Sequence, residues 1–188
     1  MTNTNVLRRL IVAAAVATVG AAPIAARIAE ARPAEQDVPQ EVKVDDGNRE
    51  FLVGHAVGVQ IYSCGAGATG FSWGPAVPRA NLYGDNGQLI VTHFAGPTWK
   101  AKDGSTVVGR RVDGITVDRT AIPWLKLEAA STAPGPDGDR LTHTTFIQRT
   151  ATTGGMPPAA STCNADTVGD IAEIPYTADY HFWKSTGS

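Results

Sequence analysis

The chain of 188 residues lacks most of the features by which common functional classes are recognised. Beyond its N-terminal segment it has no apolar run of transmembrane length, and it has no run of lysines and arginines. Charge is sparse: lysine and arginine number 16, aspartate and glutamate number 18, and the formal net charge is −2. We therefore expect neither nucleic acid nor an anionic membrane surface as a partner.

Motifs for cofactors and for common hydrolytic chemistry are also missing. There is no Gly-x-Gly-x-x-Gly after a strand and no Gly-x-Ser-x-Gly elbow. The four histidines, His55, His93, His143 and His181, show none of the short spacings of paired metal ligands. We predict no metal and no cofactor, while a metal site assembled from histidines of different strands remains the open alternative.

The N-terminal segment has the order of a secretory signal peptide. Two arginines at 8–9 precede an uncharged apolar run over residues 10–22, which is too short to span a bilayer, and small residues follow. Cleavage is expected after Ala26 or after Ala31, which makes residues 1–31 the leader. The leader carries three arginines and one glutamate, so the remaining chain has a charge of −2 − 2 = −4. We predict a secreted protein of the cell exterior or envelope, with no membrane association after cleavage.

Only two cysteines are present, Cys64 and Cys163. In an exported protein two cysteines normally pair, so we predict a disulfide between them. The bridge would join the start of the domain to its end across a separation of 163 − 64 = 99 residues.

Short runs of β-forming residues alternate with turn signals along most of the chain. Residues 32–50 are polar and mixed in charge and predict a flexible lead-in, residues 51–184 a single all-β domain, and residues 185–188 a tail. Hairpin turns are expected at the Asp-Asn-Gly of residues 85–87 and at the Asp-Gly of residues 103–104. The fold class predicted is an antiparallel β-sandwich or barrel-like domain, with the sandwich favoured.

Two segments are harder to assign. Residues 122–129 could form a helix, but Pro123 near the start and the tryptophan and leucine content favour an extended strand. Residues 150–165 contain Gly-Gly, Pro-Pro and small residues, which predict a long loop anchored by Cys163.

Five blocks of the sequence occur together in a known family. They are Gln-Ile-Tyr-Ser-Cys at 60–64, Thr-His-Phe-Ala-Gly-Pro-Thr-Trp at 92–99, Asp-Gly-Ser at 103–105, Phe-Ile-Gln-Arg at 146–149 with Gly-Gly at 154–155, and Pro-Tyr-Thr-Ala-Asp-Tyr at 175–180. Over residues 50 to 184 the chain resembles the domain-of-unknown-function family 3455. The resemblance implies a secreted β domain of bacteria or fungi. Some members are labelled malate dehydrogenase, but the sequence has no dinucleotide-binding motif to match that label.

The densest polar and aromatic block, at 92–105, is the candidate site. His93, Trp99 and Asp103 could surround a shallow pocket, with Trp99 as a platform for a flat ligand. The alternative places Trp99 in the core and makes Asp103 a turn residue. Ser105 would complete the residue types of a hydrolase triad, although it lies in the predicted turn.

Several polar residues in the predicted strands could also face a pocket. Gln60, Gln148 and Arg149 are of this kind, and they could equally be solvated or paired across strands. Tyr176, Asp179 and Tyr180 of the last strand could contribute from the side.

The sequence favours a non-catalytic binding or structural protein of the cell envelope or exterior, with a small-molecule or cell-envelope ligand. The rival hypothesis is an extracellular enzyme, either a metal-dependent oxidoreductase or a hydrolase, that uses His93 and Asp103. Convergence of two histidines, or of His93 with a carboxylate, in an open cleft would favour the enzyme. The oligomeric state cannot be predicted from the sequence.

Overall fold

The computed structural model describes residues 38–187, and they form nine antiparallel strands with two 3-10 turns. In chain order the elements are η1 (Gln40–Val42), β1 (Asn48–Gly67), β2 (Gly70–Trp73), β3 (Val77–Tyr83), β4 (Leu89–Phe94), β5 (Thr98–Ala101), β6 (Thr106–Ile115), β7 (Trp124–Ala133), β8 (Thr144–Gly154), η2 (Ala160–Thr162) and β9 (Ile171–Ser185).

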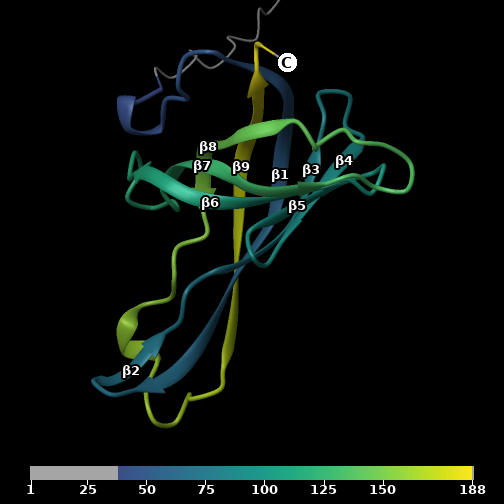
Figure 1. Cartoon of the computed structure of the whole chain (residues 1–188). Coiled ribbons are helices and arrows are strands. Elements are labelled where there is room, and N and C mark those ends of the chain that lie inside the picture. The colour runs from purple at the N-terminus through teal and green to yellow at the C-terminus, as the bar shows by residue number, and fades with distance from the viewer. Residues whose placement is uncertain (1–37, 188) are drawn as a thin grey trace, which may run out of the picture. The chain divides into compact units, whose positions relative to one another are not determined.

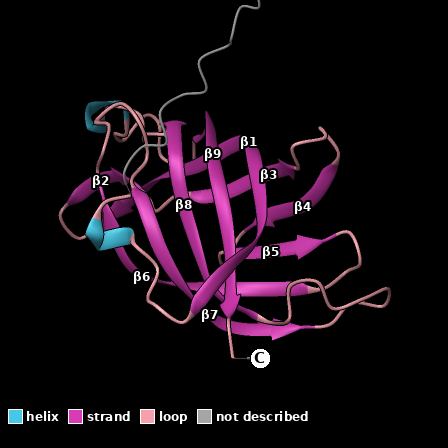
Figure 2. Ribbon diagram, turned by 90° about the horizontal axis from the view of Figure 1, so that it is seen from above, coloured by secondary structure: helices cyan, strands magenta, loops and turns pink. Residues whose placement is uncertain are grey.

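The strands form one sheet that closes on itself. Neighbours follow the order β2-β1-β3-β4-β5-β6-β7-β8-β9, and β1 pairs in addition with β9, so that every strand except β2 belongs to a closed ring. Figure 2 shows β9 between β8 and β1, where the ring closes. The all-β fold and the barrel-like arrangement are confirmed, whereas the preference for a sandwich is wrong. Hairpin signals are the same in both architectures, and only the β1–β9 pairing distinguishes them.

The long strand β1 takes part in two regions of the sheet. Its residues from Asn48 to Ser63 pair with β9, and its last residues, Cys64 to Gly67, form a hairpin with the short strand β2. Figure 1 shows β2 at the far end of β1, away from β5, β6 and β7. The closed part of the sheet therefore depends on residues 48–63 of β1.

Alternation along the strands determines which side chains face the interior, because successive residues of a strand point to opposite faces. In β1, Ala56, Gln60 and Tyr62 are buried, while His55 and Val57 are exposed. The same alternation in the other strands builds one core of buried residues, which consists of Leu52, Ala56, Ala80, Leu82, Val91, Trp99, Ala101, Val107, Ile122, Leu127, Leu141, Ile147, Tyr176, Ala178, Tyr180 and Phe182.

The largest core side chain, Trp99, packs against a glycine of β6. A Cβ atom on Gly109 would lie 2.9 Å from Trp99 Cζ3 and 3.1 Å from a Leu127 methyl carbon. Ordinary contacts begin near 3.4 Å, so a larger residue would push the indole out of place. The glycine in β6 thus makes room for the tryptophan in β5.

Both predicted hairpin turns are confirmed. Gly87 has φ 73° in the turn between β3 and β4, and Gly104 has φ 83° in the turn between β5 and β6. A positive φ of this size is strained for residues with a Cβ atom, which explains the Asx-Gly pattern in the sequence. Residues 124–133 form strand β7, so the extended interpretation of this segment is also confirmed.

Two segment predictions need correction. The predicted loop at 150–165 begins too early, because β8 continues to Gly154 through a bulge where its register with β9 shifts. The predicted lead-in over residues 32–50 extends too far into the domain. Strand β1 begins at Asn48, and Val42 and Val44 are buried, with the Val42 carbonyl accepting a hydrogen bond from Gln148 Nε2 at 2.7 Å. The two buried valines, the Gln148 hydrogen bond and the Lys126–Asp45 ion pair hold this segment against the sheet.

Cys64 and Cys163 form the predicted disulfide, which ties the end of β1 to the segment after η2. No helix within residues 38–187 is long and apolar enough to cross a membrane. The predicted signal peptide at 1–31 and the first part of the lead-in, 32–37, lie outside the described residues.

Candidate functional site

A cavity of about 390 Å³ lies inside the closed sheet, beside the turn at residues 95–97 that joins β4 to β5. Its lining comes from all the ring strands and from the segment before β7. The lining residues are Gln60, Tyr62, Ala76, Val77, Pro78, His93, Ala95, Gly96, Pro97, Trp99, Arg111, Ile122, Pro123, Leu125, Leu127, Arg149 and Tyr180. Most of them are apolar, and this volume is within the range of small-molecule sites.

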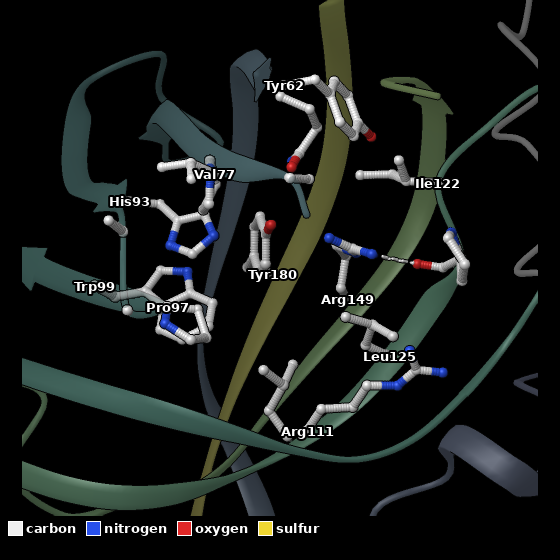
Figure 3. Close-up of a pocket in the computed structure, with 17 residues that line it drawn as sticks. Tyr62, Val77, His93, Pro97, Trp99, Arg111, Ile122, Leu125, Arg149 and Tyr180 are labelled. Carbon is white, nitrogen blue, oxygen red and sulfur yellow. Dashed lines mark hydrogen bonds between the residues drawn. The ribbon is translucent and has the colours of Figure 1, made fainter. Parts of the chain in front are cut away.

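One wall of the cavity is a cluster of three rings. His93 stacks on Trp99 with ring centroids 4.2 Å apart and planes 7° from parallel. Tyr180 meets both rings edge-on, at 5.1 Å from His93 and 5.5 Å from Trp99. Register explains the stack, because His93 of β4 is directly opposite Trp99 of β5. Figure 3 shows Tyr180 between this pair and Arg149.

His93 is held as a neutral imidazole. Only 3% of its surface is exposed, and its Nδ1 lies 2.9 Å from the Thr98 carbonyl, so Nδ1 carries the hydrogen. Burial lowers the pKa of His93 to about 4; the Thr98 carbonyl opposes the shift and the charge of Arg149 adds to it. At neutral pH the ring is thus an aromatic surface with an unprotonated Nε2.

Arg149 brings a positive charge to the cavity. It lies on β8 between Leu125 of β7 and Tyr180 of β9, two further lining residues. Its Nε and Nη2 donate to the Pro123 carbonyl at 3.0 and 2.7 Å, which fixes the guanidinium in place. Within residues 38–187 it forms no ion pair. The charge is therefore not neutralised by any carboxylate of the described residues.

The tyrosines of the interior respond to that charge. Burial raises the pKa of Tyr62, and burial followed by the neighbouring Tyr180 raises the pKa of Tyr176 strongly. In both cases the Arg149 charge opposes the rise in pKa. The positive charge of Arg149 thus lowers the pKa of three groups, His93, Tyr62 and Tyr176.

Two buried donors in the lining lack partners among the described residues. They are Trp99 Nε1 and Gln60 Nε2, each without a hydrogen bond of normal geometry. Gln60 lies near enough to Tyr176 to lower the pKa of that phenol slightly, but the angle or distance is poor for a bond. A buried donor without a partner costs about 1–3 kcal/mol, and both atoms are covered by protein rather than open to the cavity.

The bulge in β8 shapes another side of the cavity. Ala151 has φ 47° there, an uncommon value for a residue with a Cβ atom, and Gly154 and Gly155 follow with positive φ. In the bulge, the Thr152 hydroxyl donates a hydrogen bond to the Ile122 carbonyl at 2.7 Å. The Tyr62 hydroxyl donates to the Gly155 carbonyl, also at 2.7 Å. Strained backbone thus positions lining side chains, as is common beside binding sites.

The structure brings His93 and Trp99 together but places Asp103 elsewhere. Asp103 lies four residues beyond Trp99, in the turn at the other end of β5. Its carboxylate accepts the Ser105 hydroxyl at 2.6 Å and the Ser105 and Arg140 amides at 3.0 and 2.8 Å. These bonds lower the pKa of Asp103, with the Ser105 hydroxyl as the largest cause. Asp103 and Ser105 fix a turn and do not contact His93.

The remaining histidines are separate from the cavity lining. His55 bonds to Asp179 and Asp85 at 2.7 and 3.0 Å, and these carboxylates raise its pKa, with Asp85 as the largest cause. His181 pairs with Glu50 at 2.6 Å. Among residues 38–187 no three histidine, cysteine or acidic side chains are arranged to hold a metal ion.

The burial of neutral His93 should make the free energy of unfolding depend on pH. The pKa of a histidine is near 6.5 in the unfolded chain and about 4 for His93 in the folded protein. Between these two pH values His93 is therefore protonated in the unfolded state and neutral in the folded state. We expect this group to remove about 3 kcal/mol of stability over that interval. Urea unfolding at about pH 7 and pH 4.5 measures it. In His93→Phe the loss should be smaller by most of that amount, and equal pH slopes in both proteins would contradict the buried neutral imidazole.

Sequence reasoning identified Gln60, Arg149 and Tyr180 only as strand residues that could face a pocket, and the structure places all three in the lining. Gln148, named with them, faces the other way and bonds to Val42. Arg111 was missed. Its signal was the alternation Val107–Gly109–Arg111 along one strand face, which continues from the core to the cavity rim.

The described residues form a small closed β domain with a cavity that opens beside the β4–β5 turn, and comparison with known proteins identifies its family. Residues 46–184 match the family described as Protein of unknown function (DUF3455), and the chain belongs to this family. No curated protein and no solved structure matches it.

Proposed function

We propose that this protein is an exported, non-catalytic binding domain whose closed sheet holds a small organic molecule in the cavity beside the β4–β5 turn. The observation that carries the proposal is the pairing of an apolar, ring-lined wall with the guanidinium of Arg149, which forms no ion pair within residues 38–187. His93 and Trp99 form the ring-lined wall, with ring centroids 4.2 Å apart, and Arg149 supplies the polar group. Apolar cavities with a few convergent polar groups are the usual form of ligand sites.

The chemistry of the lining favours binding over catalysis. A histidine with a pKa of about 4 is a weak base and is uncharged at neutral pH, so it is poorly suited to transfer protons there. Its ring nitrogens contact no carboxylate among the described residues, and the carboxylate of Asp103 is engaged at the opposite end of β5. The cavity lining includes no aspartate, glutamate, serine, threonine or cysteine that could act as a nucleophile.

Export is part of the same proposal. The order of the N-terminal segment is that of a signal peptide, and the Cys64–Cys163 disulfide is suited to an oxidising compartment. The location that fits both is the cell exterior or envelope. We propose a small molecule or envelope component as the ligand, and neither nucleic acid nor membrane as a partner.

Native mass spectrometry of the protein exported by a bacterial host is the first test. We expect a fraction of molecules to carry extra mass below the size of a peptide, which gentle collisional activation removes. Ala95→Trp, which places a bulky ring at the cavity rim, should reduce that fraction, while Ala66→Trp in the β1–β2 hairpin should leave it unchanged. Equal loss in both variants would mean that the added mass is not bound in the cavity.

A further inference from the structure

We propose that the ligand of this cavity is a carboxylic acid with a flat or branched apolar body, and that Arg149 binds its carboxylate. This inference rests on the proposed binding function and assigns the chemical class of the ligand. It follows from the charge of the lining, from the geometry of Arg149 and from the shape of the wall opposite.

The lining is positively charged, although the chain as a whole is acidic. It includes two arginines, Arg111 and Arg149, and no carboxylate, while its histidine is neutral. Two arginines on the outer face are ion-paired: Arg79 pairs with Glu173 at 2.6 Å, and Arg110 pairs with Glu128. Arg111 of the lining and the paired Arg110 are adjacent in β6 and face opposite sides of the strand.

Arg149 is oriented before any ligand arrives. Its Nε and one Nη2 hydrogen are directed at the Pro123 carbonyl, and Pro123 itself lines the cavity. A guanidinium has five N–H donors, so the Nη1 group and the second Nη2 hydrogen remain to bind an acceptor. Two such hydrogens match the two oxygens of a carboxylate, and a guanidinium already held in place loses little entropy on binding.

The rest of the wall fits an apolar body better than a second charge. His93, Trp99 and Tyr180 present ring faces and edges, and valine, leucine, isoleucine and proline side chains complete the lining. A phosphate or sulfate alone would leave this surface empty and would normally need several cationic or backbone donors. A carboxylate joined to rings or branched carbon uses both parts of the site.

Matched acids and amides test the inference directly. Isothermal titration of the disulfide-bonded protein with benzoate, naphthoate and the branched acid 2-propylpentanoate should give binding by at least one acid. Its amide, which has nearly the same shape and no charge, should bind about tenfold to a hundredfold more weakly, as expected when a charge-assisted bond is lost. The preference should also decrease as salt is added, because the cavity is open to solvent at its rim.

Variants then locate the charge. Arg149→Gln should abolish the preference for the acid, Arg149→Lys should keep part of it, and Arg110→Gln should leave it intact. Circular dichroism and thermal unfolding confirm that each variant is folded. If Arg149→Gln fails to fold, the acid-to-amide ratio of the natural protein and the partial preference of Arg149→Lys still decide the question.

The outcomes separate this inference from the function on which it rests. Equal binding of acid and amide would overturn the carboxylate assignment and leave a binding cavity. An acid preference that survives Arg149→Gln would overturn the role of Arg149. If no acid or amide binds, and the exported protein carries no small molecule, both the assignment and the binding function fail.

Discussion

Replacement of Trp99 by alanine should lower the free energy of unfolding by about 3–5 kcal/mol, the range for a large buried aromatic. Only 1% of its surface is exposed, and it contacts Tyr180 and Phe182 in addition to His93. Gly109 packs against this indole and has no side chain that could move into the cavity left by its removal. Urea unfolding followed by circular dichroism measures the change.

Trp73→Ala is the matched control, because Trp73 is half-buried in β2 and its Nε1 bonds to Thr162 at 3.1 Å. It should cost clearly less than Trp99→Ala. A loss under about 1 kcal/mol for Trp99→Ala would be at the level of a surface substitution and would contradict the packing described here. Because Trp99 also lines the cavity, the two interpretations of this residue drawn from the sequence are not exclusive.

Removal of the disulfide should have a comparable effect. For a closed loop of 99 residues the chain-entropy relation gives about 4–5 kcal/mol of stabilisation through the unfolded state. The double variant Cys64→Ser with Cys163→Ser should lose up to that amount in urea unfolding without reductant. Natural protein unfolded in the presence of reductant should match the variant.

The same variant should keep its closed sheet. The bridge joins the end of β1 to the segment after η2, whereas the core that includes Trp99 and Tyr180 is made by the ring strands. The near-ultraviolet spectrum, which reports the packing of the aromatic cluster, should therefore change little at low temperature. A loss of stability below about 0.5 kcal/mol would show that the bridge constrains neither state.

Much of the fold could be predicted because local rules decide it. Asx-Gly pairs require positive φ at the turns, two cysteines in an exported chain pair, and alternation assigns the buried face of each strand. Closure could not be predicted in this way. It depends on the pairing of Val53 with His181 and of Val57 with Thr177, contacts between the first and last strands that no local pattern records.

The candidate site was predicted in part for the same reason. His93 and Trp99 belong to one hairpin, so their approach follows from a short register. Asp103 was placed with them because it is near in sequence, but a strand of four residues carries it to the opposite end of β5. Arg149 is far from the block at 92–105 in sequence and reaches the cavity only through the closed ring.

The central claim is that the cavity beside the β4–β5 turn binds a small organic molecule. The four tryptophans of the chain test it most directly, because Trp99 alone among them lines the cavity. In nitrogen-15 NMR spectra, titration with the acids and amides named above should move the Trp99 indole N–H signal to saturation. The indole signals of Trp73, Trp124 and Trp183 should stay in place. A Trp99 signal that no compound moves, or four signals that drift together without saturation, would contradict the claim.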